Sequence, residues 1–400
     1  MADQSLILDR RADLEGKPGL HAVLIGVSEY AHLPSPDDPP GEGLAALKKL
    51  RSSAVSALAL LRKLRTLNDE GRLVRPLKTV RFLQSPSPEE VGAEPSLAGM
   101  GAPATREIIA EALQAWRDDA AEGPASQTLF YFCGHGIRRS LEESILLTAD
   151  FLRPGLPKLF NSFRVMNIRN GMVAGPSYPD LAREQFYFID ACREKPDALD
   201  QLDTTETPKI FDAELNNTTD DRRAPVFFST LTGGLSAGVA NQPSYFVQAL
   251  IWAMDHGSFE KRKVDDDVGV AWPMTPPSLK AAIEVAKAFQ GSKVELTGLV
   301  GEPALCFRRD APQLPVEVAL APEPLPARVQ TLTLTELNTN ARHDITPVTT
   351  NGPHALDLAA GMYRITVKPR SRRFQRSESD VLFLSIRSPM PLVFDLGAAP

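Results

Sequence analysis

Long apolar runs, a signal-like start and a dense set of cysteines are all missing from this sequence. No uninterrupted apolar stretch among the 400 residues approaches the ~20 residues that a membrane-spanning helix needs. The first residues, MADQSLILDRRADLEGK, mix acids and bases and contain no apolar core of a signal peptide. The three cysteines, Cys133, Cys192 and Cys306, are too few and too scattered for a disulfide framework. We therefore expect a cytoplasmic protein that neither spans nor binds a membrane.

A strong excess of charge of either sign is also missing. Lys and Arg total 44 against 50 Asp and Glu, a formal net charge of −6. This balance gives no support for nucleic acid as a partner. With 43% hydrophobic and 24% charged residues, the chain has the composition of a globular protein. Its length suits one large or two smaller domains.

Continuous apolar runs alternate with amphipathic stretches over the first three quarters of the chain. An apolar run without polar alternation is typical of a strand buried on both faces of a sheet. Such runs predict strands at 22–27, 79–83, 128–133, 144–149, 185–190, 224–230 and 304–309. Amphipathic spacing predicts helices at 44–67, 106–119, 245–257 and 278–289, with Thr105 as the N-cap of the second. The alternation predicts an α/β fold, a mostly parallel sheet with helices on both faces.

Three segments do not follow this alternation. Residues 150–182 show no clear pattern, and the polar residues 193–223 predict a long exposed connection. A proline-rich break at 311–327 precedes segments in which apolar and polar residues alternate, the pattern of a small antiparallel β-sandwich at the C-terminus. We therefore predict two domains, 1–312 and 313–400, and expect the first to fold alone.

A histidine between two glycines follows the strand at 128–133, and a cysteine follows the strand at 185–190. Functional residues in an open α/β sheet gather at the carboxyl ends of its strands. A thiol needs a base close by to become the reactive thiolate, and a histidine at a neighbouring strand end supplies one. We therefore predict that His135 and Cys192 act together, with the N–H of Gly136 able to point into the site.

The two motifs, FYFCGHG and FYFIDACRE, resemble the signatures of the caspase-like cysteine peptidases, which include caspases, metacaspases and bacterial relatives. The resemblance extends to HAVLIGVSEY and to VFFSTLTGG with SYFVQALIWAM, and so covers about residues 20–310. It implies a caspase-like peptidase domain with Cys192 as the nucleophile and His135 as the general acid/base. It also implies an oxyanion hole formed by the N–H groups of Gly136 and Cys192.

The resemblance extends to substrate binding. Asp190 stands where caspases have a glutamine that helps bind aspartate at P1, and where metacaspases, which cleave after Arg or Lys, have aspartate. A carboxylate there would attract a basic P1 side chain and repel an acidic one. Cys133 takes the place of a serine that lines the metacaspase pocket, and Ser52 and Ser53 lie in the region that supplies a second pocket acid in metacaspases. The acids Glu29, Asp37 and Asp38 of the first loop are alternatives for that second acid.

These observations predict a cysteine endopeptidase that cleaves a protein or peptide substrate after Arg or Lys and needs no metal or other cofactor. The family resemblance implies regulated limited proteolysis, as in bacterial defence or cell death, with an activating protein or ligand as a further partner. Family members are cut within the connection at 193–223. Basic specificity predicts self-cleavage after Lys209, Arg222 or Arg223, and caspase-type specificity predicts it after Asp197, Asp200, Asp203 or Asp212.

Other interpretations of the same residues stay open. The chain could be a catalytically silent caspase-like scaffold that binds partners through its β-domain, or a thiol hydrolase that is not a peptidase. His135 could be a buried histidine held by a backbone carbonyl, and Cys192 an inert core thiol. Asp190 could cap a neighbouring helix or pair with an arginine. Cys133 and His135 could be metal ligands, but zinc needs two more at suitable spacing. The remaining histidines, His21 among them, have no partner motif and are interpreted as structural or exposed.

Overall fold

The computed structural model describes residues 3–39, 42–138, 144–192, 207–212, 220–229, 239–289, 293–298, 301–321, 329–345, 353–369, 377–378, 382–386 and 392–395. The chain divides into two compact units. Met1–Ala253 and Ile283–Cys306 form the first unit, and Met254–Ala282 and Phe307–Pro400 form the second. Packing thus groups Met254–Ala282 with the tail, and independent folding of residues 1–312 stays a prediction.

The first unit is built on one large sheet whose central strands are parallel. Its order is β1 (Leu6–Asp9), β3 (Leu77–Ser85), β2 (Leu20–Val27), β5 (Gln127–Gly134), β9 (Glu184–Ala191), β10 (Val226–Phe228) and β13 (Glu295–Thr297). β4 (Ala102–Pro103) adds to β3, and the two end strands β1 and β13 run antiparallel to their neighbours. The predicted parallel-dominated sheet is confirmed.

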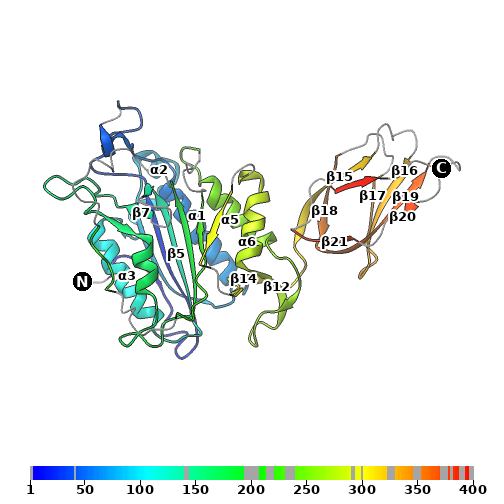
Figure 1. Ribbon diagram of the computed structural model, residues 1–400, viewed down its shortest axis with the longest axis horizontal. Coiled ribbons are helices and arrows are strands. Elements are labelled where there is room, and N and C mark those ends of the chain that lie inside the picture. Colours follow the sequence, from blue (N-terminus) through cyan, green and yellow to red (C-terminus); the bar gives the residue numbers. More distant parts are fainter. Residues whose placement is uncertain are drawn as a thin grey trace. The chain divides into compact units, whose positions relative to one another are not determined.

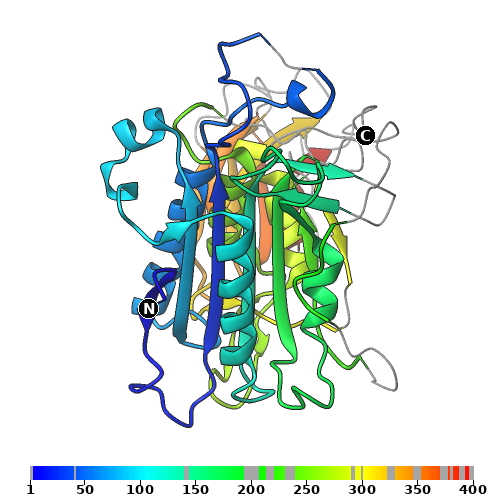
Figure 2. The same ribbon diagram turned by 90° about the vertical axis from the view of Figure 1, so that its left-hand side faces the viewer.

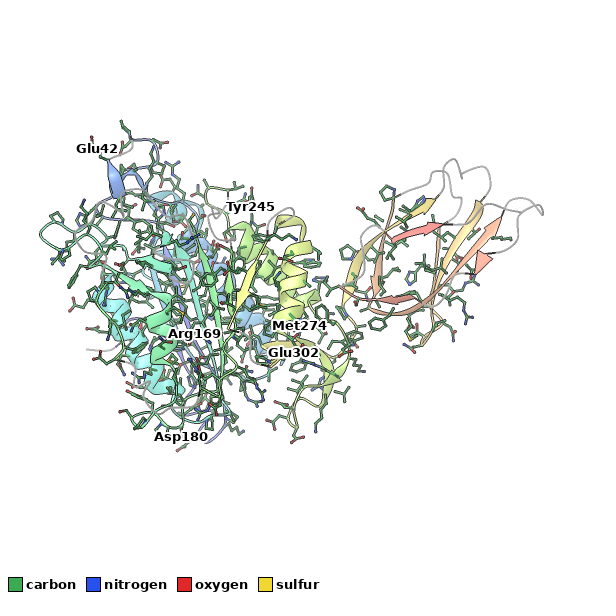
Figure 3. All side chains as sticks on the ribbon, in the orientation of Figure 1. Glu42, Arg169, Asp180, Tyr245, Met274 and Glu302 are labelled. Carbon is green, nitrogen blue, oxygen red and sulfur yellow. The ribbon has the colours of Figure 1, made fainter. Side chains whose placement is uncertain are left out.

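Helices cover both faces of this sheet (Figures 1 and 2). On one face, α3 (Arg106–Ala120) and α4 (Val165–Gly171) share an apolar core with alternate residues of the strands. On the other face, α1 (Ser53–Asp69) packs so closely on β2 that a Cβ on Gly26 would lie 2.5 Å from the carbonyl oxygen of Ser53. Side chains fill the layers between strands and helices (Figure 3). Burial on both faces explains the continuous apolar runs of β2 and β5.

The helix predicted at 44–67 begins nine residues later than its leucine spacing indicates. A short 3₁₀ turn spans Gly43–Ala46, residues 47–52 are not helical, and α1 starts at Ser53. Long-range hydrogen bonds hold the intervening segment, because the N–H of Lys49 donates to Pro34 O (3.0 Å) and that of Leu50 to Ser28 O (2.8 Å). The prediction for residues 44–52 was therefore wrong, and the reason is tertiary.

The segment 150–182 contains regular structure that its sequence did not reveal. β8 (Ser162–Arg164) joins β6 (Gly136–Arg138) and β7 (Ser144–Leu147) in a small antiparallel sheet, and α4 follows directly. The loop before α3 likewise contains α2 (Pro88–Ala93) and a 3₁₀ turn at Pro95–Leu97. Thr105 stands at the N-cap of α3, but its side chain makes no capping hydrogen bond.

The connection at 193–223 is described at 207–212 and 220–223, and there it is not simply exposed. Phe211 is 1% exposed, and a Cβ on Gly171 would lie 2.2 Å from its ring. Arg222 is 2% exposed and donates to the carbonyl oxygens of Arg169 (2.5 Å) and the Gln185 side chain (3.1 Å). The predicted exposure is wrong at these two residues, because each is held by tertiary contacts.

In the tail, strands form two sheets. One is β18 (His354–Ala359), β15 (Gln313–Ala321) and β22 (Leu392–Asp395); the other is β17 (Arg342–Ile345), β16 (Val329–Glu336), β19 (Gly361–Pro369) and β20 (Ser377–Glu378), with β21 (Leu382–Leu384) beside β19. Along β15, Leu314, Val316 and Val318 are buried and alternate with exposed residues, so that one face is apolar, as in a β-sandwich. One pair, β15 with β22, is parallel, which the predicted antiparallel pattern did not include.

The remaining elements lie between the large sheet and the tail in sequence. They are α5 (Tyr245–His256), β11 (Arg262–Lys263), β12 (Val270–Met274), α6 (Pro276–Val285), a 3₁₀ turn at Lys287–Phe289 and β14 (Cys306–Arg308). The strands β11, β12 and β14 form a three-stranded sheet. Across the part of the chain that is described, no helix combines the length and apolarity needed to cross a membrane.

Candidate active site

The predicted dyad residues follow two strands that lie side by side. β5 and β9 pair in parallel, with Cys133 opposite Asp190 and Gly134 opposite Ala191. The next residue of each strand, His135 and Cys192, therefore leaves the sheet at the same carboxyl edge. The sheet brings the two together although 56 residues separate them in the sequence.

Gly136 packs against the cysteine. A Cβ at this position would lie 2.6 Å from the carbonyl oxygen of Cys192 and 2.9 Å from the Cβ of Ala191. Any larger residue would push the two strand ends apart. The N–H of Leu147 donates to His135 O (3.0 Å), which makes Gly136 and Leu146 a non-hydrogen-bonded pair of the β6–β7 ladder. The ladder therefore leaves the N–H of Gly136 on the side away from β7.

His135 is buried and oriented by two fixed contacts. Its peptide N–H donates to the hydroxyl oxygen of Tyr30 (2.7 Å), and its ring Nε2 lies 2.6 Å from the carbonyl oxygen of Lys48. A carbonyl can only accept, so Nε2 carries the proton and Nδ1 is the basic nitrogen of the neutral ring. Burial lowers the pKa of His135 below its usual value, although the Lys48 carbonyl favours the charged form. The ring is therefore a neutral base at neutral pH.

The late start of α1 makes this orientation possible. In a helix continuous from Leu44, the carbonyl of Lys48 would accept a hydrogen bond from the N–H of residue 52. Because residues 47–52 are kept out of the helix, with Lys49 and Leu50 bonded to Pro34 and Ser28, that carbonyl accepts from His135 instead. His135 is therefore held by a backbone carbonyl, as the alternative interpretation stated, but only through Nε2. Nδ1 remains the nitrogen that can accept a proton.

Cys192 differs from the other two cysteines in its exposure. Cys133 and Cys306 are buried, whereas Cys192 is partly exposed. A position at the end of a strand and open to solvent does not fit an inert core thiol. Burial raises the pKa of Cys133 well above its usual range, and nearby Asp190 raises it further, so that Cys133 stays a thiol. These two environments separate a reactive candidate from a structural one.

Tyr30 is a site residue that sequence reasoning missed. It is fully buried, its ring centroid lies 5.0 Å from that of His135, and its hydroxyl would be 2.9 Å from a Cβ on Gly134. Burial raises its pKa far above the usual value, with further contributions from nearby Cys133 and Cys192. It therefore remains a neutral phenol between the two strand ends. The available signal was its place at the end of the first strand motif, HAVLIGVSEY.

Asp190 lies two residues before Cys192, opposite Cys133 in the β5–β9 pair. Its side chain is 1% exposed and accepts hydrogen bonds from Tyr131 (3.2 Å), the Cys133 thiol (3.6 Å) and the hydroxyl of Ser244. All three of these donors are neutral. Ser244 in turn accepts the N–H of Val247 (3.1 Å) in the first turn of α5. Among the described contacts, Ser244 therefore caps the first turn of α5, and Asp190 accepts the hydroxyl of Ser244.

The start of α1 completes the surroundings of Cys133. Ser53 and Ser56 lie close enough to the thiol to oppose the rise of its pKa. The acids considered as a second pocket acid have other partners. Glu29 pairs with Lys49 and Asp37 with Arg51, and Asp38 accepts the N–H of Ser35. Of the predicted pocket residues, the structure brings together Asp190, Cys133 and Ser53.

The sheet order, the helices on both faces and the site at the carboxyl edge define a caspase-like α/β fold. The chain belongs to the caspase family, because the family model described as the caspase domain matches residues 20–268. This membership supports a cysteine-protease type of function. The crystal structure of caspase-1 from Spodoptera frugiperda is similar, with 15% identity and a TM-score of 0.42 over 74% of this chain and 93% of that one. A search of curated proteins finds no match.

Proposed function

We propose that this protein is a cysteine endopeptidase in which Cys192 and His135 form a catalytic dyad. The observation that carries the proposal is the register of β5 and β9, which ends both strands at one edge with Gly136 packed against Cys192. The hydrogen bond from Nε2 to Lys48 supports it, because it leaves Nδ1 as the base.

The chemistry follows from these positions. Nδ1 of His135 accepts the proton of the Cys192 thiol, and the thiolate attacks the scissile carbonyl. The negative oxygen of the tetrahedral intermediate accepts hydrogen bonds from the N–H groups of Gly136 and Cys192. His135 then gives its proton to the leaving amine, and water, deprotonated by the same histidine, hydrolyses the acyl-enzyme.

We further propose a preference for Arg or Lys at P1, with Asp190 at the bottom of the pocket. The carboxylate lies in a buried position, two residues before Cys192 on the same strand end. A P1 cation would therefore meet a negative charge at low dielectric, worth ~2–5 kcal/mol, or at least tenfold discrimination. Cys133, which donates to the same carboxylate, would line the pocket without adding charge.

Self-cleavage within 193–223 is proposed as the activating step, and the structure ranks its basic sites. Arg222 is buried and held on three sides, and the main chain of Arg223 bonds to Arg183 and Gln185 at the sheet. The side chain of Lys209 is exposed, so Lys209 is the proposed basic site. Cleavage there requires residues 207–212 first to leave their main-chain hydrogen bonds to Asn167 and Arg106. Asp212 is the described acidic alternative; Asp197, Asp200 and Asp203 lie outside the described residues.

Two experiments test the proposal. In the first, the purified protein is incubated and its new termini are mapped by mass spectrometry. In the second, the protein is given a proteome-derived peptide library and the cleavage sites are determined. We expect cleavage after Arg or Lys in the library and after Lys209 in the chain, and none with Cys192→Ala. Cleavage after aspartates would remove Asp190 from the P1 pocket. Absence of cleavage in the library would favour the silent scaffold. Regulated proteolysis in the cytoplasm, as in bacterial defence, is the proposed setting.

A further inference from the structure

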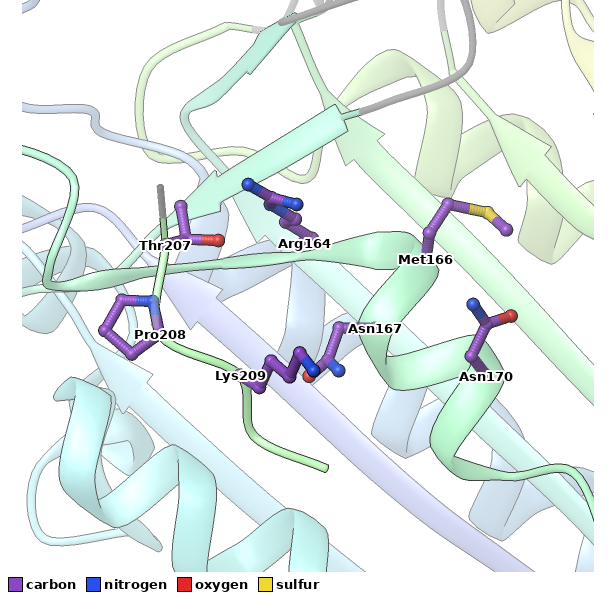
Figure 4. A pocket seen from close by; sticks show the side chains of 7 residues that line it. All are labelled: Arg164, Met166, Asn167, Asn170, Thr207, Pro208 and Lys209. Atoms are coloured by element: carbon purple, nitrogen blue, oxygen red, sulfur yellow. The ribbon is translucent and has the colours of Figure 1, made fainter. Parts of the chain in front are cut away.

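A cavity of about 540 Å³ lies between α4 and residues 207–209 of the connection (Figure 4). Arg164, Asn167 and Asn170 line it from the β8–α4 side, and Thr207 and Lys209 line it from the connection. Met166 and Pro208 supply its apolar surface. Its volume falls within the ~300–1,000 Å³ of small-molecule sites. None of these residues belongs to the proposed dyad or to the hydrogen-bond partners named for Asp190.

The walls of the cavity are fixed in place. The side chain of Asn167 accepts the N–H groups of Ile210 (2.7 Å) and Phe211 (3.1 Å) and donates to the carbonyl of Phe211 (2.8 Å). Arg106 donates to the carbonyl oxygens of Pro208 (3.0 Å) and Lys209 (3.2 Å) from the other side. Residues 207–212 are therefore held against α4, and the cavity exists before any ligand enters.

The lining has the chemistry of an anion site. Arg164 and Lys209 carry positive charge, Asn170 offers an amide, and no acidic side chain is among the described residues of the lining. Thr207 is 8% exposed, and among the described residues its hydroxyl has no hydrogen-bond partner. A buried hydroxyl without a partner costs free energy that a ligand oxygen would recover. Figure 4 shows this hydroxyl facing the space beside Arg164.

We propose that this cavity binds a small molecule that carries a phosphate group. A guanidinium and an ammonium together with hydroxyl and amide donors are the groups that recognise phosphate oxygens, with the guanidinium able to bond two oxygens at once. A ligand held between α4 and Lys209 would add to the contacts that hold residues 207–212 against α4. Occupancy would then shield the proposed cleavage site after Lys209.

The test uses the full chain with Cys192→Ala, so that self-cleavage cannot change the protein during the measurement. Isothermal titration calorimetry with inorganic phosphate, pyrophosphate and acetate, at constant ionic strength, should show saturable 1:1 binding of the phosphates and none of acetate. Lys209→Gln and Arg164→Gln should each weaken binding at least tenfold, and Thr207→Val severalfold. Lys158→Gln, which changes an exposed lysine outside the cavity, is the matched control. Thermal unfolding checks that each variant is folded.

Hydrogen exchange provides a second readout that does not depend on activity. Pyrophosphate should slow exchange of the amides at 207–212 and leave those of the tail unchanged. Binding that does not saturate, or that Lys158→Gln weakens as much as Lys209→Gln does, would overturn the proposal. Because the protein tested is inactive, phosphate binding and peptidase activity can fail independently of each other.

Discussion

Each of the two edges of the large sheet contains a buried histidine, and the two histidines are held differently. At the amino edge, His21 of β2 has both ring nitrogens bonded to side chains, Nδ1 to Thr79 (2.9 Å) and Nε2 to Glu122 (2.9 Å). At the carboxyl edge, His135 has one ring nitrogen held by the Lys48 carbonyl, and the other is the basic one. A histidine fixed at both nitrogens supports the fold, whereas one fixed at a single nitrogen can transfer a proton.

Charges follow the same division. At the amino edge, buried Arg81 pairs with buried Asp119, and buried Lys78 pairs with Glu122 (2.5 Å), which is partly open to solvent. At the carboxyl edge, the described donors to Asp190 are uncharged. Paired charges are the usual way to keep ionic groups inside a protein. In the proposed P1 pocket, the substrate would supply a cationic partner for Asp190.

The largest expected effect separates the two histidines. His135→Ala and Cys192→Ala should each lower kcat/KM by about 10³-fold or more, because members of a dyad act as a unit. His21→Leu should leave kcat/KM of the folded protein nearly unchanged. It should lower the free energy of unfolding by ~1–3 kcal/mol, because Thr79 and Glu122 lose a buried partner.

Peptide cleavage and urea unfolding of the three variants measure both quantities. A loss of turnover in His21→Leu as large as in His135→Ala would remove the distinction between the edges. Near-normal turnover in Cys192→Ala would end the peptidase proposal.

The next effect concerns the acids. Asp190→Asn keeps the shape of the side chain and removes its charge, so the preference for Arg over an uncharged P1 residue should fall at least tenfold. Asp119→Asn, at the other edge, should lower stability and leave P1 preference unchanged. Competition between paired peptide substrates measures the preference directly. Equal discrimination in the wild type and Asp190→Asn would place the P1 pocket elsewhere.

A smaller effect is expected at Tyr30. Tyr30→Phe leaves the N–H of His135 without its acceptor, and a lost hydrogen bond of ~1–1.5 kcal/mol corresponds to about tenfold in kcat. KM should change little, since the tyrosine positions the base and not the substrate. Tyr187→Phe is the matched control, because that hydroxyl bonds Gln185 (2.8 Å). A rise in KM with constant kcat would argue against a positioning role.

The smallest effect is in the pH dependence of stability. Since burial lowers the pKa of His135 in the folded state, the unfolded chain binds its proton first as the pH falls below about 6.5. The wild type should therefore lose stability between pH 6.5 and the lowered pKa more steeply than His135→Gln does. Urea unfolding at several pH values gives both slopes, and the difference isolates this group. Parallel slopes would contradict the burial of a neutral ring.

The sequence predicted the carboxyl edge well because buried parallel strands are continuous apolar runs that end sharply. The ends of β5 and β9, and so the two residues of the proposed dyad, could be located without knowing the register of these strands. The hydrogen bond from His135 to the Lys48 carbonyl could not be predicted. The leucine spacing continues through 44–67 and gives no sign that hydrogen bonds to Ser28 and Pro34 delay the start of the helix. The burial of Arg222 and Phe211 was missed for the same reason, since their partners are distant in sequence.

The short helix α4 shows a different limit. Its seven residues are too few for a clear amphipathic period, so neither it nor the cavity beside it could be predicted. The contact of Tyr30 with His135 joins residues 105 positions apart and leaves no local signal.

The most direct test of the central claim is covalent labelling. The full chain is treated with a peptidyl chloromethyl ketone that carries Arg at P1, and the modified cysteine is identified by mass spectrometry. We predict that one cysteine, Cys192, is labelled. Labelling should be much slower in His135→Ala, and much slower with a matched reagent that carries Asp at P1. Labelling of Cys133 or Cys306 at a similar rate, or none on Cys192, would contradict a dyad at the carboxyl edge of the sheet.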